Sequence, residues 1–129
     1  MTLFEAVPDL AQWDVKFVAT DINQTVLDKA ASGVYKQHEV NRGLPASLLV
    51  KYFDRVGTDW VVQQRLRDKV EFKILNLAEA WPFRGSFDII FMRNVLIYFD
   101  VEMKKHILQR ARKLLTSDGV LFLGGAETT

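Results

Sequence analysis

The chain has 129 residues, of which 49% are hydrophobic and 26% are charged, a composition typical of one folded globular domain. The net charge of +1 gives no field that would attract nucleic acid or an anionic membrane, and the lack of cysteine excludes disulfides and thiolate metal sites. The longest apolar runs are far too short to cross a bilayer, so membrane insertion is not expected.

The first predicted elements are a helix end, a buried strand and a second helix. The segment MTLFEAV is typical of a helix that leads into a strand. The nearly continuous apolar run Val15–Thr20 predicts a strand covered on both faces, and Asp21 ends it. Asn23 is suited to cap the helix that follows, and Gly33 suits the position just after its end.

The middle of the chain predicts a helix and a small β excursion. LPASLLVKYF indicates a helix with Pro45 in its first turn. The segment Thr58–Phe72 holds two short β-like runs, WVV and VEF, separated by polar residues. We therefore expect one domain over residues 1–129, with a small, hairpin-like β-subdomain inserted at 58–69. VEFKIL is expected to return to the main sheet as a strand.

The last third predicts a strand, a helix and a final strand. FDIIFM is the most apolar strand candidate, and Asp100 is placed to cap the following helix. That helix carries an apolar stripe made of Ile107, Leu108, Ala111, Leu114 and Leu115. TSDG is expected to form a turn before the last strand, VLFLGG. Strands that alternate with helices predict a parallel α/β sheet with right-handed crossovers.

Polar residues follow three of the predicted strands: Asp21, Asn76 and the pair Arg93–Asn94. In open α/β sheets, ligands bind beyond the carboxyl ends of the strands. A carboxylate at the position of Asp21 could accept hydrogen bonds from both hydroxyls of a ribose. The alternative, that Asp21 only caps the next helix, stays open at this point.

A glycine-rich phosphate turn is expected ~20 residues before such an acidic residue. Here the first glycine is Gly33, which comes after Asp21. We therefore expect that the first strand of the sheet and its glycine loop would precede residue 1, and that the chain is a fragment.

Several motifs occur in an order that resembles a known family. They are ATDIN, LDKAASGVY, LPASLLVKYF, VEFKILNL, FDIIFMRNVLIYFD and LLTSDGVLFLGGAE. Together they resemble the CheR-type glutamate methyltransferases of bacterial chemotaxis receptors. The resemblance implies a class I S-adenosylmethionine-dependent methyltransferase sheet (Rossmann-like), incomplete here. It also implies a cytoplasmic signal-transduction enzyme that methylates glutamate carboxylates of a receptor's cytoplasmic domain and releases S-adenosylhomocysteine.

The resemblance also implies roles for individual residues. Asp21 would hold the ribose hydroxyls of S-adenosylmethionine, and Asn76 and Leu77 would border the adenine and ribose. Arg93 and Asn94 would line the site beside the methionine part.

Tyr98 would face the position of methyl transfer, and Arg93 is the second candidate for a catalytic role. A tyrosine ring or hydroxyl could stabilise the sulfonium or orient the incoming carboxylate. Two alternatives stay open: Tyr98 could be a core aromatic residue, and Arg93 could pair with a structural carboxylate.

The family has an all-helical N-terminal domain, a first strand with a glycine-rich loop, and a final strand pair, and this sequence matches none of these. We therefore expect about half of a full enzyme, inactive when isolated. The alternative function is a non-catalytic signalling or scaffold remnant. A methyltransferase for some other substrate is a third reading.

Without the first strand, VKFVAT and FDIIFM would leave open edges inside the sheet. We expect direct pairing of these strands, or a homodimer that exchanges elements through the open edges. The insertion between YF and VEF is shorter and poorer in glycine than in receptor-tethering members of the family, so no tight peptide tether is expected.

Overall fold

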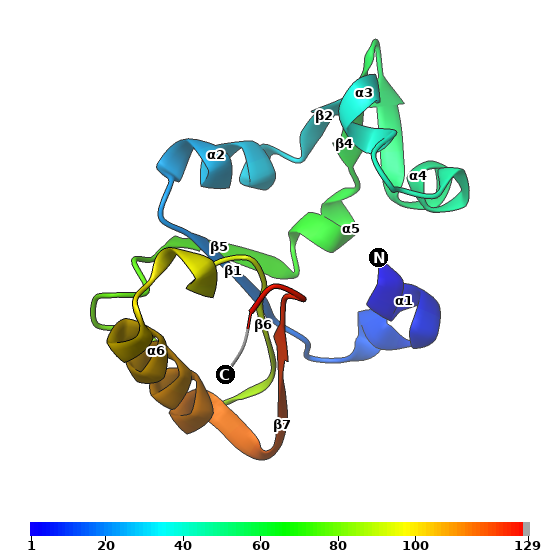
Figure 1. The fold of residues 1–129 in the computed structure, drawn as a ribbon. Coiled ribbons are helices and arrows are strands. Elements are labelled where there is room, and N and C mark those ends of the chain that lie inside the picture. Colours follow the sequence, from blue (N-terminus) through cyan, green and yellow to red (C-terminus); the bar gives the residue numbers. More distant parts are fainter. Residues whose placement is uncertain (128–129) are drawn as a thin grey trace. The chain divides into compact units, whose positions relative to one another are not determined.

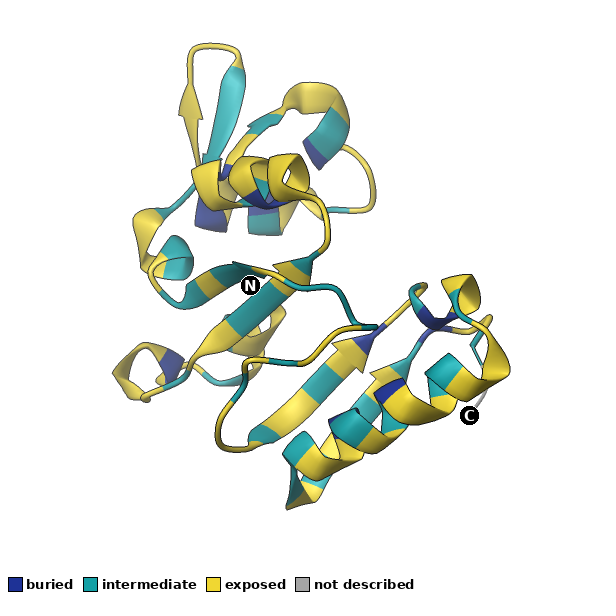
Figure 2. Ribbon diagram, turned by 90° about the vertical axis from the view of Figure 1, so that its left-hand side faces the viewer, coloured by how far each residue is buried: buried dark blue, intermediate teal, exposed yellow. Residues whose placement is uncertain are grey.

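The computed structural model describes residues 1–127 and divides the chain into two compact units, Met1–Leu75 and Asn76–Thr129 (Figure 1). Each unit has a hydrophobic cluster of its own. Their buried residues are coloured dark blue in Figure 2. The two units are therefore described one after the other.

The first unit alternates short helices and strands. Its elements are α1 (Thr2–Ala6), η1 (Leu10–Gln12), β1 (Phe17–Asp21), α2 (Gln24–Ser32), β2 (Val34–Lys36), α3 (Gln37–Val40), α4 (Ala46–Tyr52), β3 (Phe53–Val56), β4 (Asp59–Val62), α5 (Gln64–Arg67) and β5 (Val70–Ile74). The second unit contains β6 (Phe87–Met92), η2 (Leu96–Tyr98), α6 (Val101–Leu114) and β7 (Leu115–Leu123).

Strands β1 and β5 form a parallel pair, from Phe17 opposite Val70 to Asp21 opposite Ile74. Helix α2 contacts both strands. The side chain of Asn23 accepts hydrogen bonds from the first turn of α2, and Gly33 ends the helix in the left-handed conformation with φ of 68°. Both helix-end predictions are confirmed.

Strands β2, β4 and β3 form an antiparallel sheet in that order, with β4 in the centre. This sheet begins at Val34, well before the expected boundary of 58–69. Of that expected stretch, the structure makes only β4 and the helix α5. The observed sheet is larger than the expected one because the central strand β4 pairs on both sides. One of its partners, β2, comes from the chain that precedes α3.

The first unit's core cluster lies beside this antiparallel sheet. Its buried members are Val40, Leu49, Tyr52 and Phe53. Phe4 of α1 packs on the same cluster, with its ring centroid 6.2 Å from that of Tyr52. Leu49 and Tyr52 therefore place one side of α4 in this cluster.

Strands β6 and β7 form the parallel pair of the second unit, and α6 packs along it (Figure 1). Asp100 caps α6 as predicted, accepting a bond of 2.8 Å from the N–H of Met103. Ile107 and Ala111 of the predicted stripe are fully buried. The expected turn at TSDG was wrong: these residues lie within β7, where the register shifts between Phe87 and Ile89 of the partner strand.

The two parallel pairs confirm the expected α/β class. Within the described residues, β1 and β6 belong to separate two-stranded sheets. Since β1 lies in the first unit and β6 in the second, direct pairing of these two strands stays a prediction.

Candidate functional site

Asp21 is the last residue of β1, at the carboxyl end of the parallel pair. Its backbone carbonyl accepts a hydrogen bond of 2.9 Å from Leu75. Its Oδ1 accepts one of 2.8 Å from the N–H of Asn23. The residue that caps α2 is Asn23. The alternative that Asp21 serves only as the cap of this helix is therefore wrong. No hydrogen bond among residues 1–127 engages Oδ2, which leaves an acceptor at the strand end.

Asn76 and Leu77 begin the second unit, directly after β5. Asn76 Oδ1 accepts a hydrogen bond of 3.0 Å from the N–H of Ala78, a local turn that asparagine favours. The Leu77 carbonyl accepts hydrogen bonds of 3.0 Å each from Trp81 Nε1 and from Arg110 Nη1 of α6. The backbone at Leu77 is therefore fixed by Trp81 of its own loop and by Arg110 of α6.

Arg93 and Asn94 follow the end of β6. Asn94 has φ of 59°, the left-handed region that few residues with a side chain occupy. Arg93 is exposed, and no ion pair among the described residues includes it. The alternative reading of Arg93 as the partner of a structural carboxylate therefore finds no support.

Tyr98 ends the 3-10 turn η2 and is 80% exposed. Leu96, two residues earlier, is 1% exposed and takes the core position of this turn. The alternative of Tyr98 as a core aromatic residue is wrong, because Leu96 occupies the buried side and directs Tyr98 outward.

The loop after β6 is held by Glu127, which is not among the site residues predicted from the sequence. Its carboxylate accepts hydrogen bonds from the N–H groups of Val95, Leu96 and Gly124. Desolvation, the largest single influence, acts to raise the pKa of Glu127. The backbone hydrogen bonds together outweigh it and hold the pKa below its ordinary value. A carboxylate three residues after a strand-ending glycine was the available signal.

The predicted residues thus fall into two groups. Arg93, Asn94 and Tyr98 share one short loop of the second unit, and Asn76 and Leu77 belong to the same unit. Asp21 belongs to the first unit, at the carboxyl end of β1. Their assignment to one cofactor site stays a prediction.

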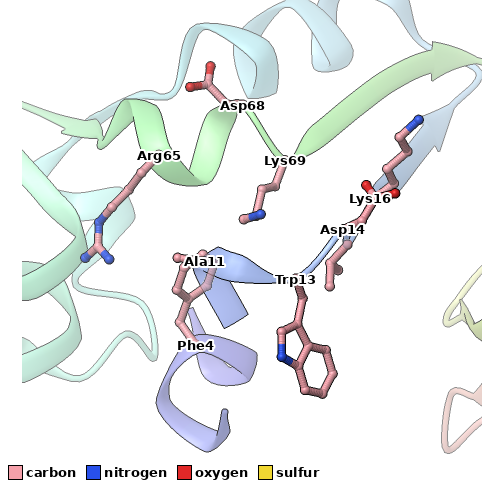
Figure 3. Close-up of a pocket in the computed structure, with 9 residues that line it drawn as sticks. Phe4, Ala11, Trp13, Asp14, Lys16, Arg65, Asp68 and Lys69 are labelled. Carbon is pink, nitrogen blue, oxygen red and sulfur yellow. The ribbon is translucent and has the colours of Figure 1, made fainter. Parts of the chain in front are cut away.

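A pocket of about 450 Å³ lies in the first unit (Figure 3). Lys16 and Lys69, two of its lining residues, directly precede β1 and β5. The pocket therefore lies at the amino ends of these strands, opposite the end that carries Asp21. Its position does not match that of the predicted cofactor site.

The described part of the chain holds neither a membrane-spanning helix nor a cluster of metal ligands. No helix there is long and apolar enough to cross a membrane. No group of three or more His, Cys, Asp or Glu residues among residues 1–127 could hold a metal ion.

Comparison with known proteins gives matches over the whole sequence. The family model described as CheR methyltransferase, SAM binding domain, matches residues 1–129. Chemotaxis protein methyltransferase 1 of Pseudomonas aeruginosa is 43% identical over 114 residues, which cover 88% of this chain and 42% of that protein. The chemotaxis protein methyltransferase of Escherichia coli K12 is 44% identical over 118 residues, which cover 87% of this chain and 41% of that protein.

The chain thus spans less than half the length of these relatives. The family match confirms the expected fold class, the class I methyltransferase sheet.

Proposed function

The chain belongs to the CheR methyltransferase family, and we propose that it supplies the cofactor-binding part of an S-adenosylmethionine-dependent protein-glutamate methyltransferase. The family model over residues 1–129 supports this. The observation that carries the proposal further is the loop after β6. That loop keeps Arg93, Asn94 and Tyr98 at a carboxyl strand end, where ligands of α/β sheets bind.

Taken one by one, the proposed side chains have the chemistry that S-adenosylmethionine requires. Asp21 offers Oδ2 at the end of β1 to ribose hydroxyls, and hydrogen bonds to a charged group contribute about 1.5–3 kcal/mol each. Leu77 offers an apolar side chain for the adenine, next to Asn76. Arg93 and Asn94 would line the methionine part. When bound, the cofactor supplies a methyl group on a sulfonium, which is already a good leaving group.

Little proton transfer is therefore required of the protein, and its main task is alignment. A carboxylate oxygen of the substrate must face the methyl carbon in line with the sulfur. Positioning of this kind can lower a barrier by up to ~7–11 kcal/mol. The exposed ring of Tyr98 is suited to contact the sulfonium or to orient the carboxylate.

The substrate is proposed to be glutamate side chains of a chemotaxis receptor's cytoplasmic domain. Relatives named chemotaxis protein methyltransferase support this. The products would be a glutamyl methyl ester and S-adenosylhomocysteine, and the site of action would be the cytoplasm. The alternative is a methyltransferase that acts on some other protein. Mass spectrometry of the methylated products would distinguish the two, because it identifies the protein that carries the methyl group.

The second candidate function is a scaffold remnant that has lost cofactor binding. Isothermal titration of the chain with S-adenosylhomocysteine separates the two. We expect micromolar binding, weakened about tenfold or more in Asp21→Asn because the ribose loses a charged acceptor. Asp28→Asn, on the exposed face of α2, serves as the control. Absence of binding by the unaltered chain would favour the remnant.

We further propose that the isolated chain does not methylate receptor, because it spans less than half of its relatives. Methyl transfer by this chain alone would contradict that expectation. We also expect that the chain does not bind the tail peptide of a receptor tightly. A micromolar complex with such a peptide in calorimetry would contradict this expectation.

A homodimer through open strand edges is the proposed oligomeric state. Strand β1 has one partner, β5, and β6 has one partner, β7. A strand paired on one side only exposes N–H and C=O groups to another chain. Light scattering at high concentration tests this, and a strictly monomeric chain would count against it.

A further inference from the structure

The loop after β6 has a backbone that needs support. Asn94 is the single non-glycine residue with positive φ among residues 1–127. Asparagine adopts the left-handed conformation more readily than most residues with a side chain, but the conformation still costs free energy that neighbouring contacts can offset. The N–H groups of Val95 and Leu96 follow immediately, at the start of η2, where no preceding helical turn supplies acceptors.

One carboxylate satisfies these donors. Glu127 Oε1 accepts hydrogen bonds of 2.6 Å from Val95 N–H and 2.8 Å from Leu96 N–H. Glu127 Oε2 accepts one of 2.7 Å from Gly124 N–H. The N–H of Glu127 itself donates to the Gly124 carbonyl at 3.1 Å and closes the turn that carries the carboxylate. Successive N–H groups that converge on an anion form a binding nest, here filled by the chain's own side chain.

Gly124 completes this arrangement because it lacks a side chain. A Cβ there would lie 2.8 Å from Asn94 Oδ1, 3.0 Å from Glu127 Oε2 and 3.1 Å from the Asn94 nitrogen. Strands β6 and β7 run parallel and end side by side, with Met92 opposite Leu123. The carboxylate therefore joins the two segments that leave these neighbouring strands.

We propose that Glu127 is a positioning residue for the loop Arg93–Tyr98. Its carboxylate holds Asn94 in the left-handed conformation and thereby sets the direction in which Arg93 and Tyr98 leave the sheet. The claim that Arg93 and Tyr98 thereby face a bound cofactor rests on the proposed function. The claim that Glu127 holds the loop does not depend on that function. A glutamine at this position can replace only one of the two carboxylate oxygens and is neutral, so its NH₂ group would face a backbone donor in place of the other oxygen.

Amide hydrogen exchange on the full chain tests the hold on the loop without any cofactor. We expect the amides of Val95, Leu96 and Gly124 to be protected, and to exchange about tenfold faster or more in Glu127→Gln. Amides within β6 should keep their rates. Glu102→Gln is the matched control, because that side chain is 77% exposed and forms an ion pair with Lys105 of its own helix. Unprotected amides in the unaltered chain, or equal rates in Glu127→Gln, would overturn the proposal.

Calorimetry with S-adenosylhomocysteine tests the consequence for the site. We expect Glu127→Gln to weaken binding about tenfold, Glu127→Asp to give an intermediate loss, and Glu102→Gln to match the unaltered chain. Tighter binding by Glu127→Gln would overturn the proposal, because the carboxylate would then be blocking the nest against a ligand anion. If the unaltered chain does not bind, the proposed function fails, and the exchange rates still decide the role of Glu127. If Glu127→Gln does not fold, exchange in the unaltered chain and in Glu127→Asp decides it.

Discussion

Single residues at the ends of elements determine how the short segments of this chain are held. In the first unit, the buried Tyr52 donates a hydrogen bond of 2.6 Å from its hydroxyl to Glu5 Oε1. Lys51 forms an ion pair with the same oxygen at 2.7 Å. The helix α1 is thereby joined to α4 through one carboxylate.

This contact predicts a pH dependence of the first unit. The bond to Lys51, followed by that to Tyr52, lowers the pKa of Glu5 from its ordinary value of 4.5. A carboxyl whose pKa is lower in the folded state contributes its full stabilisation above the ordinary value, and the contribution disappears as the pH falls through the lowered value. In Tyr52→Phe we expect the pKa of Glu5, followed by carboxyl-carbon NMR, to move back toward 4.5. Tyr35→Phe, which leaves this contact intact, should not move it.

Residues at strand ends could be predicted from sequence, while residues that hold them could not. Asp21 and Arg93 were found because an apolar run stops just before a polar residue. Glu127 and Arg110 were missed because the hydrogen bonds that join them to Val95 and to Leu77 span more than 30 positions. A charged residue on a helix such as α6 looks the same in the sequence whether it binds a carbonyl or faces solvent.

At the scale of the elements, the stability of helix α6 depends on the side chain that caps its N-terminus. Asp100 precedes the helix and accepts a bond of 2.8 Å from Met103 N–H, which leaves one fewer unsatisfied donor at the helix start. We expect Asp100→Ala to lower the free energy of unfolding of the second unit by about 1 kcal/mol in urea titrations. Asp100→Asn keeps a capping oxygen and should lose much less. Equal losses in both variants would contradict a capping role.

The longer elements could be predicted, and the shorter ones could not. The helix α6 and strand β6 follow from clear apolar periodicity. Strand β2 spans only Val34–Lys36 and exists because it pairs with β4, so no local pattern marks it. The TSDG segment has the composition of a turn, yet it lies within β7, in the register shift between Leu115, opposite Phe87, and Val120, opposite Ile89.

At the scale of the whole molecule, the chain has two hydrophobic cores that share no residue. One surrounds Tyr52 in the first unit, and the other surrounds Leu96 and Ile107 in the second. The face of the β6–β7 pair that carries Phe91 and Phe122 is exposed, with these two rings stacked at 5.0 Å. Each two-stranded sheet therefore buries only part of its apolar surface, and small units of this kind are only marginally stable.

Because the two cores are separate, a cavity made in one core is expected to destabilise only the unit that contains it. Leu96 is 1% exposed and packs in the second unit's cluster, so Leu96→Ala is expected to cost about 2–5 kcal/mol there. That loss is comparable to the whole stability of so small a unit. In Leu96→Ala we expect fast amide exchange throughout β6 and α6, while amides of β1, β4 and β5 keep the protection they have in the unaltered chain. Ile97→Ala, which truncates the neighbouring side chain that is 47% exposed, is the control and should leave both units protected. Loss of protection in both units together would mean that they unfold as one cooperative structure.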